Sequence, residues 1–309
     1  TVEVQTRAYH KHHLSVGITL HNLGKLYKKQ GKLVQAMEHY ERALRIIRGS
    51  VGVEHSIVGK VLGNMALILH LQCRYADSLG MYRRSIDISS RALGGDHVSI
   101  AKIYHNIAEV LQDQGNFNEA IDVFTKALDL KTKRLGDEHK SVANTYGGLA
   151  CVFTKQGLYD KAMEWHTKAL KIKTNVFGQE HSTVAKTYCH MAMVLREQDR
   201  CDEAMGLLEK AMAIQKRAYG PSHRLVGESY QFMGMVLKKQ KKLDEAMVQY
   251  RLALEILEGK FGRNHGSVSR VLHNMALIRQ KRCDYEDAMK LFQESLQINL
   301  EVLGKEHPL

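Results

Sequence analysis

Eight histidines at a constant spacing are the first residues in this sequence whose type could do chemistry. They lie 42 residues apart, at His13, His55, His97, His139, His181, His223, His265 and His307. Imidazole can bind a metal ion or act as a general base. Successive copies, however, lie one long repeat apart, well beyond the distance of about 2.0–2.1 Å that joins zinc to a nitrogen ligand. We therefore expect these histidines to cap helices or pack loops, and we expect no metal, cofactor or catalytic centre.

Asparagines recur nine residues after several of the histidines. They are Asn22, Asn64, Asn106 and Asn274. An amide side chain carries two N–H donors and a carbonyl acceptor. Such a column could pair with the N–H and C=O groups of an extended peptide regardless of the peptide's sequence. The alternative is that these amides bond to a neighbouring helix or to water, and both interpretations remain open.

Basic side chains recur in adjacent columns of a chain whose formal net charge is +12. Five residues after a histidine lie Lys60, Lys102, Asn144, Lys186 and Arg270, while His105 and Arg196 occupy positions eight and fifteen. A cationic column along one face would concentrate positive potential there. This pattern favours an acidic or phosphorylated peptide as ligand; the alternative is the solvated face of a basic protein. Apolar groove candidates are Leu67, Met193, Phe232, Met235 and Leu277.

The elements that must position these residues are two helices in each 42-residue unit. Apolar and small residues recur at helical spacing in two blocks, which predicts one helix from about positions 1 to 16 after the histidine and another from about 20 to 37. Glycine at position 39 suits a left-handed residue that ends a helix. Small residues at positions 11 and 23, such as Ala150 and Ala162, are expected where the two helices face each other.

The constant step predicts an all-α array of stacked helix pairs rather than several compact domains. We expect seven tandem repeats with no insertion between them: residues 13–54, 55–96, 97–138, 139–180, 181–222, 223–264 and 265–306. Residues 1–12 are expected to end a preceding repeat, and residues 307–309 to open a further one.

Two segments carry a family resemblance. Leu135–Gly136–Asp137–Glu138–His139–Lys140–Ser141–Val142–Ala143 and Gln156–Gly157–Leu158–Tyr159–Asp160–Lys161–Ala162 are similar to the 42-residue tetratricopeptide repeat (TPR) of kinesin light chains and nephrocystin-3-like scaffolds. The resemblance implies a right-handed superhelical solenoid in which the first helices line a concave peptide-binding groove and the asparagine column holds peptide backbone. The family's proline after the repeat histidine occurs here only as Pro308.

Several function classes are disfavoured by what the sequence contains. We find no phosphate-binding Gly–Lys–Ser/Thr loop and no Gly–x–Ser–x–Gly motif, so we expect no enzyme. No apolar run reaches 18 residues, so we expect no membrane span. The five cysteines form no close pair, which favours reduced thiols and a cytoplasmic location, with cytoskeletal association as one option.

The sequence therefore favours a protein-interaction scaffold or adaptor whose groove binds an extended acidic segment of a protein partner. Two alternatives stay open. One is a helical-repeat RNA reader, although interruptions at Gly63, Gly147 and Gly148 and scarce groove aromatics make nucleic acid the less favoured ligand. The other is homotypic assembly, because an uncapped repeat end could stack on a second copy.

Overall fold

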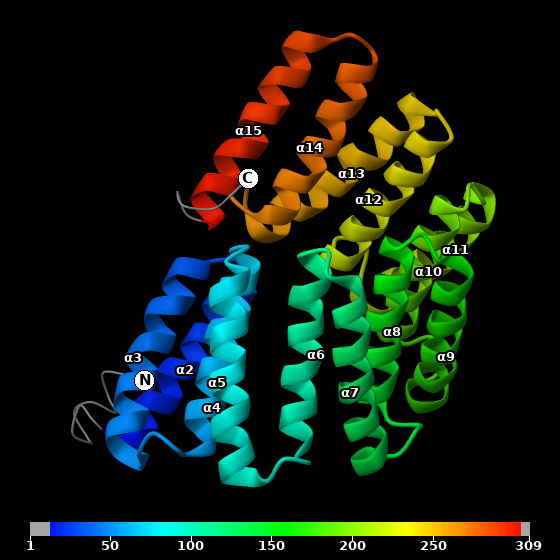
Figure 1. Ribbon diagram of the computed structural model, residues 1–309. Helices are drawn as coiled ribbons and strands as arrows, with labels where there is room; N and C mark the ends of the chain where they lie inside the picture. Colours follow the sequence, from blue (N-terminus) through cyan, green and yellow to red (C-terminus); the bar gives the residue numbers. More distant parts are fainter. Residues whose placement is uncertain (1–12, 304–309) are drawn as a thin grey trace. The chain divides into compact units, whose positions relative to one another are not determined.

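The computed structural model describes residues 13–303, and within that range the chain forms 14 α-helices and no strand (Figure 1). The first helix of each pair is α2 (Leu14–Lys29), α4 (Ser56–Leu71), α6 (Val98–Asp113), α8 (Lys140–Lys155), α10 (Ser182–Glu197), α12 (Arg224–Lys239) or α14 (Gly266–Lys281). The second is α3 (Leu33–Val51), α5 (Tyr75–Leu93), α7 (Phe117–Leu135), α9 (Tyr159–Phe177), α11 (Cys201–Tyr219), α13 (Leu243–Phe261) or α15 (Tyr285–Leu303). The segments predicted to belong to flanking repeats, 1–12 and 307–309, lie outside the described residues.

The helix bounds follow the sequence period. First helices such as α2 have 16 residues and second helices such as α3 have 19. Counted from the preceding histidine, the first helices run from position 1 to 16, as predicted. The second helices run from position 20 to 38, one residue beyond the predicted end.

The periodic histidines are helix N-caps throughout the described chain. Each has an extended backbone, and its side chain accepts a hydrogen bond from the backbone N–H two residues on; the Ser141 N to His139 Nδ1 distance, for example, is 3.1 Å. This satisfies one of the donors that a helix N-terminus leaves without an intrahelical acceptor. Nδ1 can accept only when it carries no proton, so this capping bond requires the tautomer with its proton on Nε2. The predicted capping role is confirmed.

Three of the capping rings also stack on an aromatic side chain at the end of the preceding second helix. Phe261 and His265 lie 4.0 Å apart between ring centroids with an interplanar angle of 7°. Phe177–His181 and Tyr219–His223 have the same stacked arrangement. Each stack ties the end of one helix pair to the start of the next.

The glycine that follows each of the second helices from α3 to α13 has a positive φ, as predicted, but not the left-handed helical conformation. Gly136, for instance, has φ 80° and ψ 160°. That region is accessible to glycine and to almost no other residue. The predicted αL conformation is therefore wrong in ψ, because the chain must leave the helix extended to reach the next capping histidine.

Left-handed residues do occur, in the tight turn between the two helices of a pair. Gly115 occupies this turn with φ 84°, and Lys241 and Asp199 occupy the equivalent turns with φ 64° and 61°. An L-residue with a side chain pays about 1–2 kcal/mol for this conformation.

Small residues let the paired helices approach each other. Ala150 and Ala162 are fully buried. The Ser78 hydroxyl of α5 donates a hydrogen bond to the backbone carbonyl of Ala66 in α4, with 2.8 Å between the two oxygen atoms. Positions 11 and 23 of one pair therefore meet as predicted. Large aromatic residues on the second helices, among them Tyr40, Tyr82 and Phe124, fill the space beside them and are fully buried.

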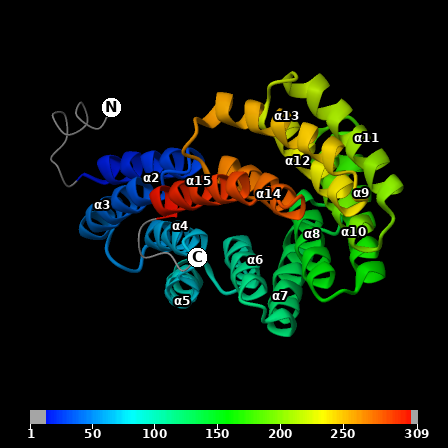
Figure 2. The ribbon, with the colours of Figure 1, turned by 90° about the horizontal axis from the view of Figure 1, so that it is seen from above.

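The chain divides into two compact units. Within the described residues the first holds α2–α7, up to Gly136, and the second runs from Asp137 to Glu301 and holds α8–α14 with most of α15. In each unit a helix packs on its pair partner and on the next pair; both ribbon views show α12 beside α13, for example (Figures 1 and 2). Over residues 13–303, no helix combines the length and the apolar character needed to cross a bilayer.

Candidate functional site

The first unit contains a cationic cavity with a volume of about 240 Å³. It is lined by His21, Lys25, Gly59, Lys60, Gly63, Asn64, Ser85, Ser89, Ser99, Lys102, Ile103 and Asn106. Four predicted site residues meet here, since Lys60 and Asn64 come from α4 and Lys102 and Asn106 from α6. Lysines are the only residues in this lining with a permanent charge, and no carboxylate is among them.

Asn64 already has one partner at this cavity. Its Nδ2 atom donates to Nε2 of His21, 2.6 Å away on the preceding first helix. Burial lowers the pKa of His21 to about 4, helped by Lys25 and Lys60, so the imidazole is neutral and can accept. One N–H of the Asn64 amide is therefore used between helices, and its second N–H and its carbonyl oxygen are left for another partner.

A second cavity, with a volume of about 580 Å³, lies in the second unit. It brings together three predicted residues, Lys186, Arg270 and Asn274, with the apolar candidates Phe232 and Met235. Its remaining lining residues are Cys189, His190, Gln215, Arg224, Leu225, Glu228, Ser229, Gln231, Ser269, His273, Ser295 and Asn299. The one acidic member, Glu228, accepts from Arg224 over 2.8 Å, which leaves Lys186 and Arg270 as the exposed cations of the cavity.

The other predicted site residues lie outside both linings. Asn22 is exposed and accepts from Lys25 Nζ at 3.3 Å, and Asn144 is exposed on α8. His105 packs its ring edge on Phe124 and lies 3.5 Å from a Glu109 carboxylate oxygen. Arg196 is ion-paired with its neighbour Glu197.

Two lysines of the second helices were not predicted from the sequence. Lys131 of α7 is buried and Lys173 of α9 is half-buried, and burial lowers the pKa of each to about 8. Repulsion from Lys102 acts on Lys131 in the same direction, and repulsion from Lys186 acts on Lys173. Their place in the repeat could have predicted their burial. Both lysines stand 34 residues after a periodic histidine, where other repeats have the apolar residues Ile47 and Leu257.

Both cavity linings include groups suited to ligand binding. The cavities offer ammonium, guanidinium and amide groups, which recognise carboxylates, phosphates and peptide backbone. In the described repeats the side chains of the periodic histidines act as the hydrogen-bond acceptors that cap the first helices.

Helix pairs of constant length, stacked on one another within each unit, define an α-helical repeat protein of the solenoid class. Comparison of the sequence with family models identifies the family within this class. The tetratricopeptide repeat family model matches residues 1–48, 58–133, 99–175 and 183–259, and a second tetratricopeptide repeat model matches residues 268–309. The chain belongs to the tetratricopeptide repeat family.

Solved structures share this fold at low sequence identity. BtubC (BKLC) from P. vanneervenii is 22% identical, with a TM-score of 0.53 over 78% of this chain and 94% of its own. A putative kinesin light chain from Podosopora anserina, with nearly identical TPR-like repeats, is 21% identical, with a TM-score of 0.50 over 66% of this chain and 97% of its own. The Rap conjugation gene regulator of plasmid pLS20, in complex with the Phr* peptide, is 15% identical, with a TM-score of 0.66 over 95% of this chain and 78% of its own. No curated protein matched the sequence.

Proposed function

We propose that this chain is a protein-interaction scaffold whose first helices bind an extended, acidic segment of a partner protein. The observation that carries the proposal is the cavity of the first unit, where Lys25, Lys60 and Lys102 line the same space as two asparagine amides. The adaptor role, the acidic ligand and an intracellular location are parts of this proposal.

The charge pattern supports an anionic ligand. Lys28 lies near the same lysines, and its pKa is lowered by burial and then by Lys102, Lys25 and Lys29. Clustered ammonium groups repel one another, so a carboxylate or phosphate placed among them relieves that repulsion as well as forming ion pairs. The buried Lys131 ammonium adds to the same field.

The amides support a peptide as the carrier of that charge. Asn64 and Asn106 are half-buried at equivalent positions of successive helix pairs, and the His21 bond holds Asn64 in place. A fixed amide loses little conformational entropy when it pairs with peptide backbone. A structural neighbour solved with a bound peptide agrees with this use of the fold.

Fluorescence anisotropy with a labelled acidic peptide, a neutral peptide of equal length and single-stranded RNA tests the proposal. We expect the acidic peptide to bind most tightly and its affinity to fall as salt is raised, because ion pairs are screened. RNA binding that persists at high salt would favour the RNA-reader alternative instead. A mass that rises with protein concentration in light scattering would favour homotypic assembly.

Matched charge variants separate the groove from general basicity. The double variant Lys60→Ala/Lys102→Ala should weaken acidic-peptide binding by about 10-fold or more, the equivalent of about 1.4 kcal/mol. The control Arg84→Ala/Lys126→Ala removes the same charge from exposed positions on the second helices α5 and α7. Equal losses of peptide affinity in the two variants would show that nonspecific charge attraction, and not the groove, accounts for binding.

An asparagine variant tests the backbone contacts. We expect Asn64→Ala/Asn106→Ala to weaken the acidic and the neutral peptide by the same factor, since the amides are proposed to read backbone rather than charge. Unchanged affinity for both peptides would remove the asparagines from the site while leaving the charge argument intact.

A further inference from the structure

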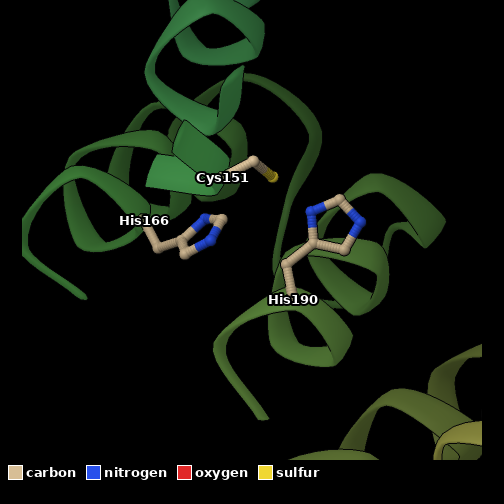
Figure 3. Close-up of side chains that lie close together, drawn as sticks. All are labelled: Cys151, His166 and His190. Carbon is tan, nitrogen blue, oxygen red and sulfur yellow. The ribbon is translucent and has the colours of Figure 1, made fainter. Parts of the chain in front are cut away.

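A cysteine and two histidines meet in the second unit, away from the capping histidines. Cys151 of α8, His166 of α9 and His190 of α10 place their ligand atoms within 4.8 Å of one another. Figure 3 shows the Cys151 thiol directed toward the space between the two imidazole rings. The rings meet edge to face, with their centroids 5.8 Å apart.

All three residues depart from their repeat columns. His166 stands at position 27, where the other repeats have Tyr40, Tyr82, Phe124, Leu208, Tyr250 and Phe292. His190 stands in the asparagine column of Asn22, Asn64 and Asn106. Cys151 stands at position 12, where the other repeats have Lys25, Leu67, Glu109, Met193, Met235 and Leu277. These departures fall on three consecutive helices and converge on one point.

The buried histidine is poorly explained by packing alone. His166 is only 1% exposed, and its Nδ1 atom is buried without a hydrogen-bond partner. A buried polar atom without a hydrogen-bond partner destabilises the folded state. Phe124 and Leu208 fill the same column without that cost, whereas the buried hydroxyl groups of Tyr40, Tyr82 and Tyr250 share it. A cation between Nδ1 and its neighbours would satisfy this atom.

We propose that Cys151, His166 and His190 form a zinc-binding site. Zinc favours thiolate and imidazole ligands, whereas magnesium and calcium require oxygen. Around one tetrahedral zinc the ligand atoms lie about 3.3–3.8 Å apart. Small rotations of the half-buried Cys151 and His190 side chains close the remaining distance of about 1 Å. Binding releases the thiol proton of Cys151 to solvent, and the three ligands leave a fourth position for water.

The charged neighbours set the conditions for this site. Lys173 and Lys186 both lower the pKa of His190, after burial and His166, so they also repel a cation. Lys173 also interacts electrostatically with Cys151, and its own pKa is lowered to about 8, first by burial. Zinc affinity should therefore rise with pH, because binding releases the thiol proton and because the charge of Lys173 is lost near pH 8.

Cobalt substitution in the full chain provides the first measurement. Co²⁺ bound by a thiolate gives a sulfur-to-metal charge-transfer absorption, and we expect one equivalent per chain to produce it and Zn²⁺ to abolish it by displacement. Cu⁺ forms a second arm, because a sulfur and two imidazoles also suit that ion. Displacement of Co²⁺ by Cu⁺ but not by Zn²⁺ would overturn the assignment to zinc. The sequence also holds His10 and His12 outside the described residues, but imidazole alone gives no thiolate band.

Variants drawn from the protein's own repeats keep the test independent of folding. His166→Phe restores the side chain of Phe124, and His190→Asn restores that of Asn106. Each should keep or raise the melting temperature without metal, yet lose the thiolate band and the zinc-induced rise in melting temperature. Loss of an outer-shell partner alone costs about 10–100-fold in metal affinity, so loss of a ligand should cost more than about 100-fold.

The matched cysteine variants are Cys151→Met, which follows the column of Met193, and Cys283→Ser, which removes an exposed thiol of another helix pair. Only the first should abolish the band. A Co²⁺ thiolate band that survives Cys151→Met or His166→Phe would show that the metal binds elsewhere and would overturn the proposal.

Discussion

Tyr250 fills the space into which a side chain at Gly234 would project. A Cβ atom added at Gly234 would lie 2.6 Å from Cε1 of the Tyr250 ring, and the equivalent pair in the first unit, Gly24 and Tyr40, has the same separation. Both tyrosines are fully buried between the helices of their pair. In these two pairs, the close approach of the helices thus depends on a glycine on one helix and an aromatic ring on the other.

This relationship predicts that Gly234→Ala destabilises the protein by about 1–3 kcal/mol through overpacking, even though alanine is the better helix former. Gly147 provides the control, since it lies within α8 and an added Cβ would meet no atom within 4 Å. Gly147→Ala should stabilise by about 0.5–1 kcal/mol. Urea unfolding measures both, and two shifts of the same sign would contradict the packing account.

The capping histidines predict a second result. His181→Ala removes the acceptor for the Thr183 backbone N–H, now 3.2 Å from Nδ1, and should cost about 1 kcal/mol. His181→Asn supplies another N-cap acceptor and should recover part of that loss, although it also removes the stacking on Phe177. Thermal melts of the two variants check the order. Equal melting temperatures would mean that the stacked ring, not the cap, carries the stability.

Stability should also fall in mild acid. Burial lowers the pKa of His166 to about 4 and that of His190 to about 3, from an ordinary value of 6.5. Between pH 6.5 and these lowered pKa values, the unfolded chain binds protons that the folded chain does not bind. The stability of the folded state is therefore greatest above pH 6.5 and decreases as the pH falls toward 4. We expect a loss of about 1–2 kcal/mol per histidine by pH 5.

The measurement is the urea midpoint at pH 7.5 and at pH 5, with metal chelated. His166→Phe removes one titrating group from the core and should reduce the difference between the two midpoints. A midpoint difference that is the same with and without His166 would assign the acid sensitivity to other groups.

The turn between paired helices predicts a stabilising substitution. Lys241 holds a positive φ of 64°, where Gly31, Gly115 and Gly157 stand in other turns. Lys241→Gly removes the strain of a side chain in that region and should stabilise by about 0.5–1 kcal/mol after the entropy of glycine is counted. Gly115→Ala, the reverse change at φ 84°, should destabilise by about 1 kcal/mol in the same assay.

The sequence period was enough to predict the helices, the capping histidines and the small residues at the helix contacts. Each of these features depends on neighbouring residues within one 42-residue unit. The residues that make the contact recur at the same spacing in several units. Candidate groove residues could be placed on the first helices for the same reason. The family match supports that level of description and no finer one.

Only the tertiary structure decided what depends on unique residues rather than repeated ones. It separated Asn64, which bonds to His21 beside a cavity, from Asn22, which lies outside it, although both occupy one column. It also revealed the buried Lys131 and the meeting of Cys151 with two histidines. The repeat period is shared by all repeats, so it determines the scaffold. The role of a residue that occurs in one repeat only depends on the packing that brings helices from neighbouring repeats to the same point.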